Sequence, residues 1–298
     1  MKILVAIDAL SSQVPWLGTL AARPWPASSS FWLFSVFNPY PFTAAPTIQE
    51  RLKRLMLQNL ESAAKPLKMS GWDTTTRVIE GNARRDINRF AREWGADWVV
   101  VGCNEVPELG RLLLGSTAQS VVRHAPCSVE VIRPTRAAVN SAGCPGMRIL
   151  VATDGSDLSV AALRSVASRP WPDGSVVRII SVPEFILLKD PSYIRTHEVK
   201  DLGEASVEDA KHCVARGAEM LAGSKLQVCS DVPTFQDRPH CVILNEAKAW
   251  QTDMIVVGSH GRSGFDRVIM GSVSEAVALH AKCSVEVIRQ SETVRCEK

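Results

Sequence analysis

The sequence has no long apolar run, no marked excess of charge and no cysteine pair with C-x-x-C spacing. No stretch approaches the ~18 consecutive apolar residues of a membrane span, so no span is predicted. The formal net charge is +3, from 34 basic and 31 acidic residues, and this balance argues against a nucleic-acid partner. The composition, 46% hydrophobic and 22% charged, is typical of a soluble globular protein with apolar material for two domains.

The eight cysteines show none of the spacings that are typical of a zinc site or a disulfide framework. Several lie in apolar contexts such as "CSVEVI", which favours buried, reduced thiols in a cytosolic protein. The adjacent pairs His212-Cys213 and His240-Cys241 suit a shared metal poorly, because neighbouring residues on a helix point apart. The start, "MKILVAIDAL", contains Asp8 and no cleavage site, so we expect a first strand rather than a signal peptide, and a cytoplasmic location.

The chain contains an internal repeat of domain length. Four segments occur twice in the same order: "KILVAID" (2–8) and "RILVATD" (148–154), "AARPWP" (21–26) and "ASRPWP" (167–172), "DWVVVG" (97–102) and "DMIVVG" (253–258), "RHAPCSVEVIR" (123–133) and "LHAKCSVEVIR" (279–289). The segment 134–147 lacks apolar periodicity and is rich in Pro, Gly, Ala and Ser, as linkers are. We therefore predict two copies of one domain, residues 1–134 and 147–298.

Short β-branched runs alternate with helical patterns in each copy. The predicted strands are 2–7, 31–36, 75–79, 97–101 and 128–133 in the first copy, and 148–153, 176–182, 225–230, 254–258 and 284–289 in the second. The predicted helices are 47–67 in the first copy, and 157–168, 203–223, 239–250 and 272–281 in the second. Strands such as "WVVV" and "MIVV" are apolar at every position, which favours a parallel sheet covered by helices on both faces. The prediction is thus an α/β fold, with two doubly wound domains of five parallel strands each.

The segment "VVGSHGRSGFDRVIMGSVSE" (256–275) follows a predicted interior strand and leads into a helix, where doubly wound sheets bind ligands. Its glycines allow backbone N–H groups to approach a ligand closely. A helix that begins near Ser272 would add free N–H groups and a positive dipole end, which together suit a phosphate. Arg262 and Arg267 could neutralise charge there. The alternative is that the glycines only form turns and Ser272 only caps the helix.

The spacing G-x2-G-x9-G-S, formed by Gly258, Gly261, Gly271 and Ser272, resembles the nucleotide-binding motif of the universal stress protein family. Gly264 falls outside this spacing. "RILVATDGS" resembles the family's first strand and acidic turn, and "CSVEVIR" resembles its last strand. The resemblance covers essentially the whole chain, once per repeat. It implies a tandem two-domain member with a Rossmann-like fold of the adenine nucleotide alpha hydrolase type.

The resemblance also implies an ATP site in the second domain. The implied contacts to phosphates, ribose and adenine, with two further loop residues of the pocket, are Thr153, Asp154, Gly155, Val182, Gly258, His260, Gly261, Arg262, Gly271, Ser272, Val273 and Ser274. Asp154 would approach the ribose and adenine, and the Val182 backbone would meet adenine. Without the resemblance, a turn or capping carboxylate is the favoured interpretation of Asp154. Mg²⁺ is expected to accompany the phosphates, although no dedicated ligand set is visible.

The first copy departs from the motif. It keeps Gly102, Gly115 and Ser116, but Glu105 stands where the second copy has Gly261. A carboxylate there would repel a triphosphate, so we predict that the first domain binds ATP poorly or not at all. Two further differences also favour weak ATP binding by the first domain: Val106 stands in place of Arg262, and Ala9 stands in place of Gly155. The alternative is that Glu105 turns to solvent and the site survives.

No Walker A lysine motif, G-x-S-x-G elbow or H-E-x-x-H helix is present. We therefore expect a nucleotide-binding module in which ATP is a regulatory ligand of a stress response. Two alternatives remain: a scaffold that binds no nucleotide, and a slow ATPase that uses His260 or Asp266. Family members pair through their last strands, so the two domains are expected to pair within one chain, and a homodimer is compatible with this. Residues 183–203 could form a lid or an interface.

Overall fold

The computed structural model describes residues 1–10, 14, 16–23, 25–40, 45–106, 111–133, 146–183, 196–234, 237–262 and 270–290, with the backbone alone at 104–106, 111–113 and 196–200. Ten strands form one sheet: β1 (Lys2–Ala6), β2 (Ser30–Phe37), β3 (Asp73–Glu80), β4 (Trp98–Gly102), β7 (Ser128–Ile132), β8 (Arg148–Ala152), β9 (Val176–Ile180), β10 (Gln227–Asp231), β11 (Met254–Gly258) and β12 (Ser284–Ile288). All of them lie close to the predicted bounds.

The helices are α1 (Trp16–Ala22), α2 (Pro46–Met69), α3 (Ala83–Trp94), α4 (Ser116–His124), α5 (Asp157–Ser168), α6 (Thr196–Leu221), α7 (Pro239–Ala249) and α8 (Ser272–His280). Local chemistry fixes several of their ends. The Asn82 side chain caps α3 by accepting from Arg84 N, and Gly95 ends this helix at φ 68°. Ser156 caps α5 by accepting from Ser159 N.

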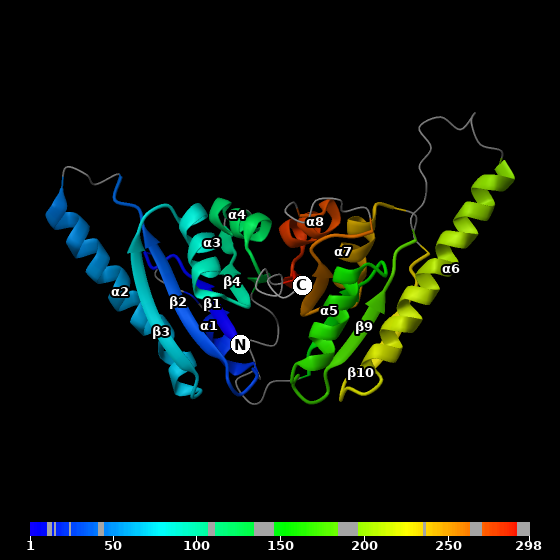
Figure 1. The fold of residues 1–298 in the computed structure, drawn as a ribbon, viewed down its shortest axis with the longest axis horizontal. Helices are drawn as coiled ribbons and strands as arrows, with labels where there is room; N and C mark the ends of the chain where they lie inside the picture. The colour runs from blue at the N-terminus through cyan, green and yellow to red at the C-terminus, as the bar shows by residue number, and fades with distance from the viewer. Residues whose placement is uncertain are drawn as a thin grey trace, which may run out of the picture.

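The sheet order is β10-β9-β8-β11-β12-β7-β4-β1-β2-β3, so the two domains share one continuous sheet (Figure 1). Pairing is parallel within each domain, as predicted. At the junction β12 runs antiparallel to β7, with Glu286 opposite Glu130. The expected pairing of the two last strands therefore occurs within one chain.

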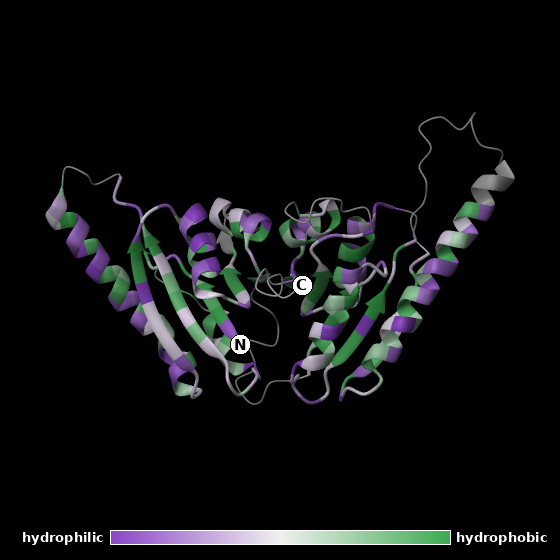
Figure 2. Cartoon of the chain, viewed as in Figure 1, coloured by the Kyte–Doolittle hydropathy of each residue, from purple (hydrophilic) through white to green (hydrophobic). Residues whose placement is uncertain are grey.

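Helices cover both faces of the sheet, as Figure 1 shows. Side chains of α1, α2, α5 and α6 pack on one face, and those of α3, α4, α7 and α8 pack on the other. Figure 2 shows apolar residues concentrated in the strands and hydrophilic residues along the outer sides of the helices. This arrangement buries the strands on both faces, which explains why "WVVV" and "MIVV" carry no polar alternation.

Two parts of the fold differ from the prediction. α6 begins at Thr196 rather than at 203, so the end of the segment 183–203 is helical. Residues 184–195 of that segment lie outside the described residues. In the first domain a small hairpin, β5 (Asn104–Val106) and β6 (Arg111–Leu113), occupies the place of the glycine segment. The predicted linker lies outside the described residues except for its last two residues.

Candidate functional site

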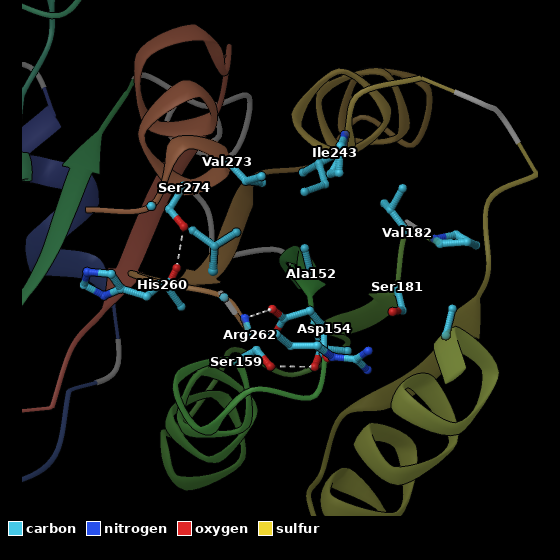
Figure 3. Close-up of a pocket in the computed structure, with 18 of the residues that line it drawn as sticks. Ala152, Asp154, Ser159, Ser181, Val182, Ile243, His260, Arg262, Val273 and Ser274 are labelled. Atoms are coloured by element: carbon cyan, nitrogen blue, oxygen red, sulfur yellow. Dashed lines mark hydrogen bonds between the residues drawn. The ribbon is translucent and has the colours of Figure 1, made fainter. Parts of the chain in front are cut away.

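A cavity of about 630 Å³ lies at the carboxyl ends of β8, β9 and β11 (Figure 3). The neighbours of β8 in the sheet are β9 and β11, which follow it at different points of the chain. Strand order therefore reverses here, and this is the switch point where doubly wound sheets bind ligands. The lining residues are Ala152, Thr153, Asp154, Ser159, Ser181, Val182, Pro183, Leu202, Ala205, Ser206, Asp209, Ala210, Pro239, Ile243, Val257, Gly258, His260, Gly261, Arg262, Met270, Gly271, Ser272, Val273 and Ser274.

All of the residues predicted for the site line this cavity except Gly155, which lies in the turn behind Asp154 at φ +80°. The second wall of the cavity was not predicted. It comes from α6 and α7 and includes Ser206, Asp209 and Ile243. No motif marks these residues in the sequence, because their place depends on how two helices pack against the sheet.

The Asp154 carboxylate organises one side of the cavity. Its Oδ1 accepts hydrogen bonds from Ser156 N (3.0 Å) and Ser156 Oγ (2.6 Å), and its Oδ2 accepts from Arg262 N (3.0 Å). Burial alone would raise the pKa of Asp154, but these hydrogen bonds outweigh burial, and the pKa is lowered. The group is therefore an ionised acceptor at the rim of the cavity.

Two motif glycines are required by close approach of the chain. A Cβ at Gly261 would lie 2.6 Å from Asp154 Oδ2, so any side chain there displaces the carboxylate. A Cβ at Gly258 would lie 2.7 Å from the carbonyl carbon of Leu158, in the first turn of α5. The structure thus gives Gly261 a role within the protein, in addition to the approach to phosphate for which the sequence suggested it.

The N-terminus of α8 faces the cavity. Gly271 is its N-cap residue, and no side chain caps the helix among the described residues. The exposed Ser272 begins the helix. Ser274 donates its hydroxyl to Gly258 O at 2.5 Å and so ties the helix to the end of β11. Free first-turn N–H groups and the helix dipole make this end of the cavity suited to an anion.

The His260 ring points away from the cavity and toward the domain junction (Figure 3). Its Nδ1 lies 3.0 Å from Ser259 Oγ, and its Nε2 is buried without a hydrogen-bond partner among the described residues. Burial lowers the pKa of His260, and the positive charge of Arg289 lowers it further. The imidazole is therefore not directed at a ligand in this cavity.

The corresponding place in the first domain is built differently. Gly102 ends β4 as Gly258 ends β11, but its Cβ position lies 2.6 Å from Nε1 of the buried Trp16. The repeat aligns Trp16 with Ala162, so an indole fills space that a methyl group occupies near the second-domain site. The side chain of Glu105 lies outside the described residues, and its effect on binding stays a prediction.

The described part of the chain lacks two kinds of feature. No helix in it combines the length and apolar character needed to cross a membrane. It also contains no cluster of three or more His, Cys, Asp or Glu side chains that could hold a metal ion. Among the six described cysteines, Cys127 and Cys283 are buried and Cys229 is exposed. Asp266, Arg267 and Gly264 lie outside the described residues.

Comparison with known proteins defines the class. The profile of the Universal stress protein family matches residues 1–133 and 147–289, so the chain belongs to this family as a tandem two-domain member. It is 29% identical over 260 residues to a universal stress protein of Mycolicibacterium smegmatis, covering 85% of this chain and 81% of the relative. It is 33% identical over 204 residues to one of Mycobacterium tuberculosis, covering 66% of this chain and 63% of that relative.

The fold is also that of the family. The crystal structure of a universal stress protein from Archaeoglobus fulgidus superposes with a TM-score of 0.65, covering 98% of this chain and 97% of that chain at 18% identity. The Rossmann-like architecture and the arrangement of two domains in one chain are thus shared along nearly the whole length.

Proposed function

We propose that the second domain binds ATP as a regulatory ligand and that the first domain does not. The observation that carries this proposal is the position of the cavity, at the switch point of the sheet and bounded by the motif glycines and the uncapped N-terminus of α8. The family's ATP-binding motif falls on these same residues, which supports the proposal.

The cavity has chemistry for each part of the nucleotide. The N-terminus of α8 and the backbone around Gly261 suit the phosphates. The ionised Asp154 suits ribose hydroxyls, which are hydrogen-bond donors. Val182 and Ile243 supply an apolar surface for the base. Mg²⁺ would arrive on the phosphates with water completing its shell, because the described residues contain no ligand cluster for it.

ATP would act by binding one conformation better than another and thereby shifting its population. Binding to the folded state alone also raises stability, by about 2.7 kcal/mol at a free concentration one hundred times Kd. A stress-response protein of this kind would report the nucleotide level through its stability or through its affinity for a partner.

The first experiment is mass spectrometry of small molecules released from freshly purified protein, followed by isothermal titration with ATP. We expect one site per chain. The variant Gly261→Glu copies the first domain and should raise Kd at least about tenfold through charge repulsion and displacement of Asp154. Gly223→Glu is the matched control, because a Cβ at the exposed Gly223 meets nothing within 4 Å.

The outcomes separate the candidate functions. Two equivalent sites per chain would contradict the asymmetry between the domains. Absence of released nucleotide and of any heat with ATP would favour a scaffold that acts through protein contacts. Phosphate release that is lost on replacement of Asp266 or His260 would identify a slow ATPase.

A further inference from the structure

The Arg262 side chain turns back from the glycine loop and engages three separate groups of the protein. Its Nε donates to the carbonyl oxygen of Asp154 at 2.5 Å, its Nη1 lies 3.4 Å from Asp209 Oδ2, and its Nη2 lies 3.4 Å from Cys213 Sγ. Each nitrogen of the guanidinium thus has a protein partner. The sequence suggested that this cation would neutralise phosphate, but its contacts are with the walls of the cavity.

These contacts connect three elements that contribute to the cavity. Arg262 belongs to the loop after β11, Asp154 to the turn after β8, and Asp209 and Cys213 to α6. Figure 1 shows α6 extending along the outer edge of the second domain and past the end of the sheet. Part of this helix forms the wall opposite the glycine loop. Arg262 therefore ties a projecting helix to the loop that approaches the ligand.

The first domain lacks both members of this ion pair. Asp73 pairs with Ser30 in the first domain, and Gln227 pairs with Val176 in the second, so Asp73 and Gln227 are equivalent positions of the repeat. Leu55 of α2 and Asp209 of α6 precede these two positions by the same number of residues and are therefore equivalent as well. Arg262 aligns with Val106. An ion pair in one domain thus corresponds to two apolar residues in the other, and Leu55 is exposed.

Cys213, the third partner of Arg262, is also replaced by a different residue in the first domain. The same register aligns Asn59 with Cys213, and Asn59 Nδ2 donates to Ala9 O at 2.9 Å. In the first domain, α2 is therefore hydrogen-bonded directly to the turn after β1. In the second domain, Arg262 forms hydrogen bonds with both the corresponding helix and the corresponding turn. The connection between helix and turn is thus made in both domains, and in the second it is made through the glycine loop.

We infer that Arg262 is a positioning residue that acts with Asp209 as a latch, holding α6 and the turn after β8 against the glycine loop. This inference rests on the proposed function. The latch shapes the cavity for the whole nucleotide and does not bind its phosphates. Its ion pair is half exposed, with side-chain exposures of 50% and 65%, so salt weakens it.

The two roles of Arg262 differ in their dependence on phosphate number. Titration of Arg262→Gln with AMP, ADP and ATP should show the same loss of affinity for each nucleotide, about tenfold. A cation on the phosphates would instead give a loss that grows from AMP to ATP. ADP and ATP suffice for the comparison if AMP binds the unmodified protein too weakly.

Arg262→Lys is the second variant. It keeps the charge but cannot make three divergent hydrogen bonds, so the latch requires it to resemble Arg262→Gln. Preserved ATP affinity in Arg262→Lys would overturn the inference. So would a loss confined to ATP, or an unchanged affinity in both variants.

Asp209→Asn tests the other half of the latch. We expect two- to fivefold faster release of nucleotide, in line with about 0.5–1 kcal/mol for an exposed pair, and no difference from the unmodified protein in 1 M salt. Leu55→Asp is the matched control in the first domain and should leave release unchanged. An unaltered release rate in Asp209→Asn at low salt would contradict the latch. If the unmodified protein binds no nucleotide, the proposed function fails instead.

Discussion

Glu130 and Glu286 lie directly opposite each other where the two domains join, and both are fully buried. Each is ion-paired to an arginine of its own domain: Arg23 with Glu130 and Arg169 with Glu286, both at 2.5 Å. The two arginines occupy the same place in the repeated "RPWP" segments. The approximate symmetry of the chain therefore brings two acid–base pairs together at the centre of the sheet.

The two pairs are not equivalent. Glu286 accepts from Arg169 at both oxygens, at 2.7 and 2.5 Å, and the Arg169 guanidinium lies over the rings of Trp98 and Trp171. Glu130 accepts from Arg23 at Oε1, while its Oε2 is buried without a hydrogen-bond partner among the described residues. An unpaired buried carboxylate oxygen is costly, and a proton on it would remove part of that cost.

Protonation of Glu130 should make stability fall with rising pH. Burial raises the pKa of Glu130, Arg23 opposes this, and the charge of Glu286 adds to it. The folded state then binds this proton more tightly than the unfolded state does. Its contribution to the free energy of unfolding is fully present below the ordinary value of 4.5, and it is lost as pH rises through the folded pKa.

Urea unfolding between pH 4 and 8 measures this effect. Between pH 4.5 and the folded pKa of Glu130, the free energy of unfolding of the unmodified protein should fall by up to about 1.4 kcal/mol per pH unit, and Glu130→Gln should lack this slope. Glu275→Gln is the control, because that carboxylate pairs with the exposed Arg123 outside this buried group. Parallel pH profiles for the unmodified protein and Glu130→Gln would show that Glu130 is ionised throughout.

Removal of one arginine should lower the free energy of unfolding far more than removal of both residues of an arginine–glutamate ion pair. Arg169→Met leaves Glu286 buried without a cation, and we expect a loss of about 3–5 kcal/mol in the free energy of unfolding. The double variant Arg169→Met/Glu286→Met should recover most of that loss. Arg123→Met, which breaks an exposed pair, should cost no more than about 1 kcal/mol. Equal losses for the single and double variants would contradict this account.

The sequence predicted the parts of this protein that depend on local pattern. The β-branched runs gave the strands, because strands buried on both faces must be apolar at every position. The glycine spacing predicted one side of the cavity, because close backbone approach admits only glycine there. The resemblance of the repeated "CSVEVIR" to the family's last strand predicted the junction, because family members pair through that strand.

What the sequence did not predict depends on packing between distant elements. The α6 and α7 wall of the cavity carries no motif, and the direction of the His260 ring is set by its neighbours at the junction. The contact of Trp16 with Gly102 joins residues that lie far apart in the sequence of the first domain. Polar alternation and glycine spacing carry no information on such contacts, so these features emerged only from the structure.

The cysteines should differ widely in reactivity. Burial raises the pKa of Cys283 to about 12, so at pH 8 only about one such thiol in ten thousand is ionised. Cys229 is exposed, although partial burial raises its pKa as well. Alkylation of the folded protein, mapped by mass spectrometry, should modify Cys229 while Cys283 stays free. Both should react in guanidinium chloride. Comparable labelling of the two in the folded protein would contradict the burial of Cys283.

Gly261→Ala should damage the site through Asp154 rather than through the ligand. A methyl group 2.6 Å from Asp154 Oδ2 must displace the carboxylate and disturb its bonds to Ser156 and Arg262. We expect a loss of about 1–3 kcal/mol in stability even without nucleotide, as for other overpacked sites. Chemical denaturation of the nucleotide-free protein measures this directly. Gly223→Ala is the control, because its Cβ meets nothing within 4 Å.

A double-mutant cycle with Asp154→Ala identifies the cause. If the clash with Asp154 is responsible, Gly261→Ala should cost little in the Asp154→Ala background, because the displaced carboxylate is then absent. The coupling between the two substitutions should therefore approach the whole loss measured for Gly261→Ala alone. Additive effects would show that Gly261 is required for another reason, such as the conformation of the loop itself.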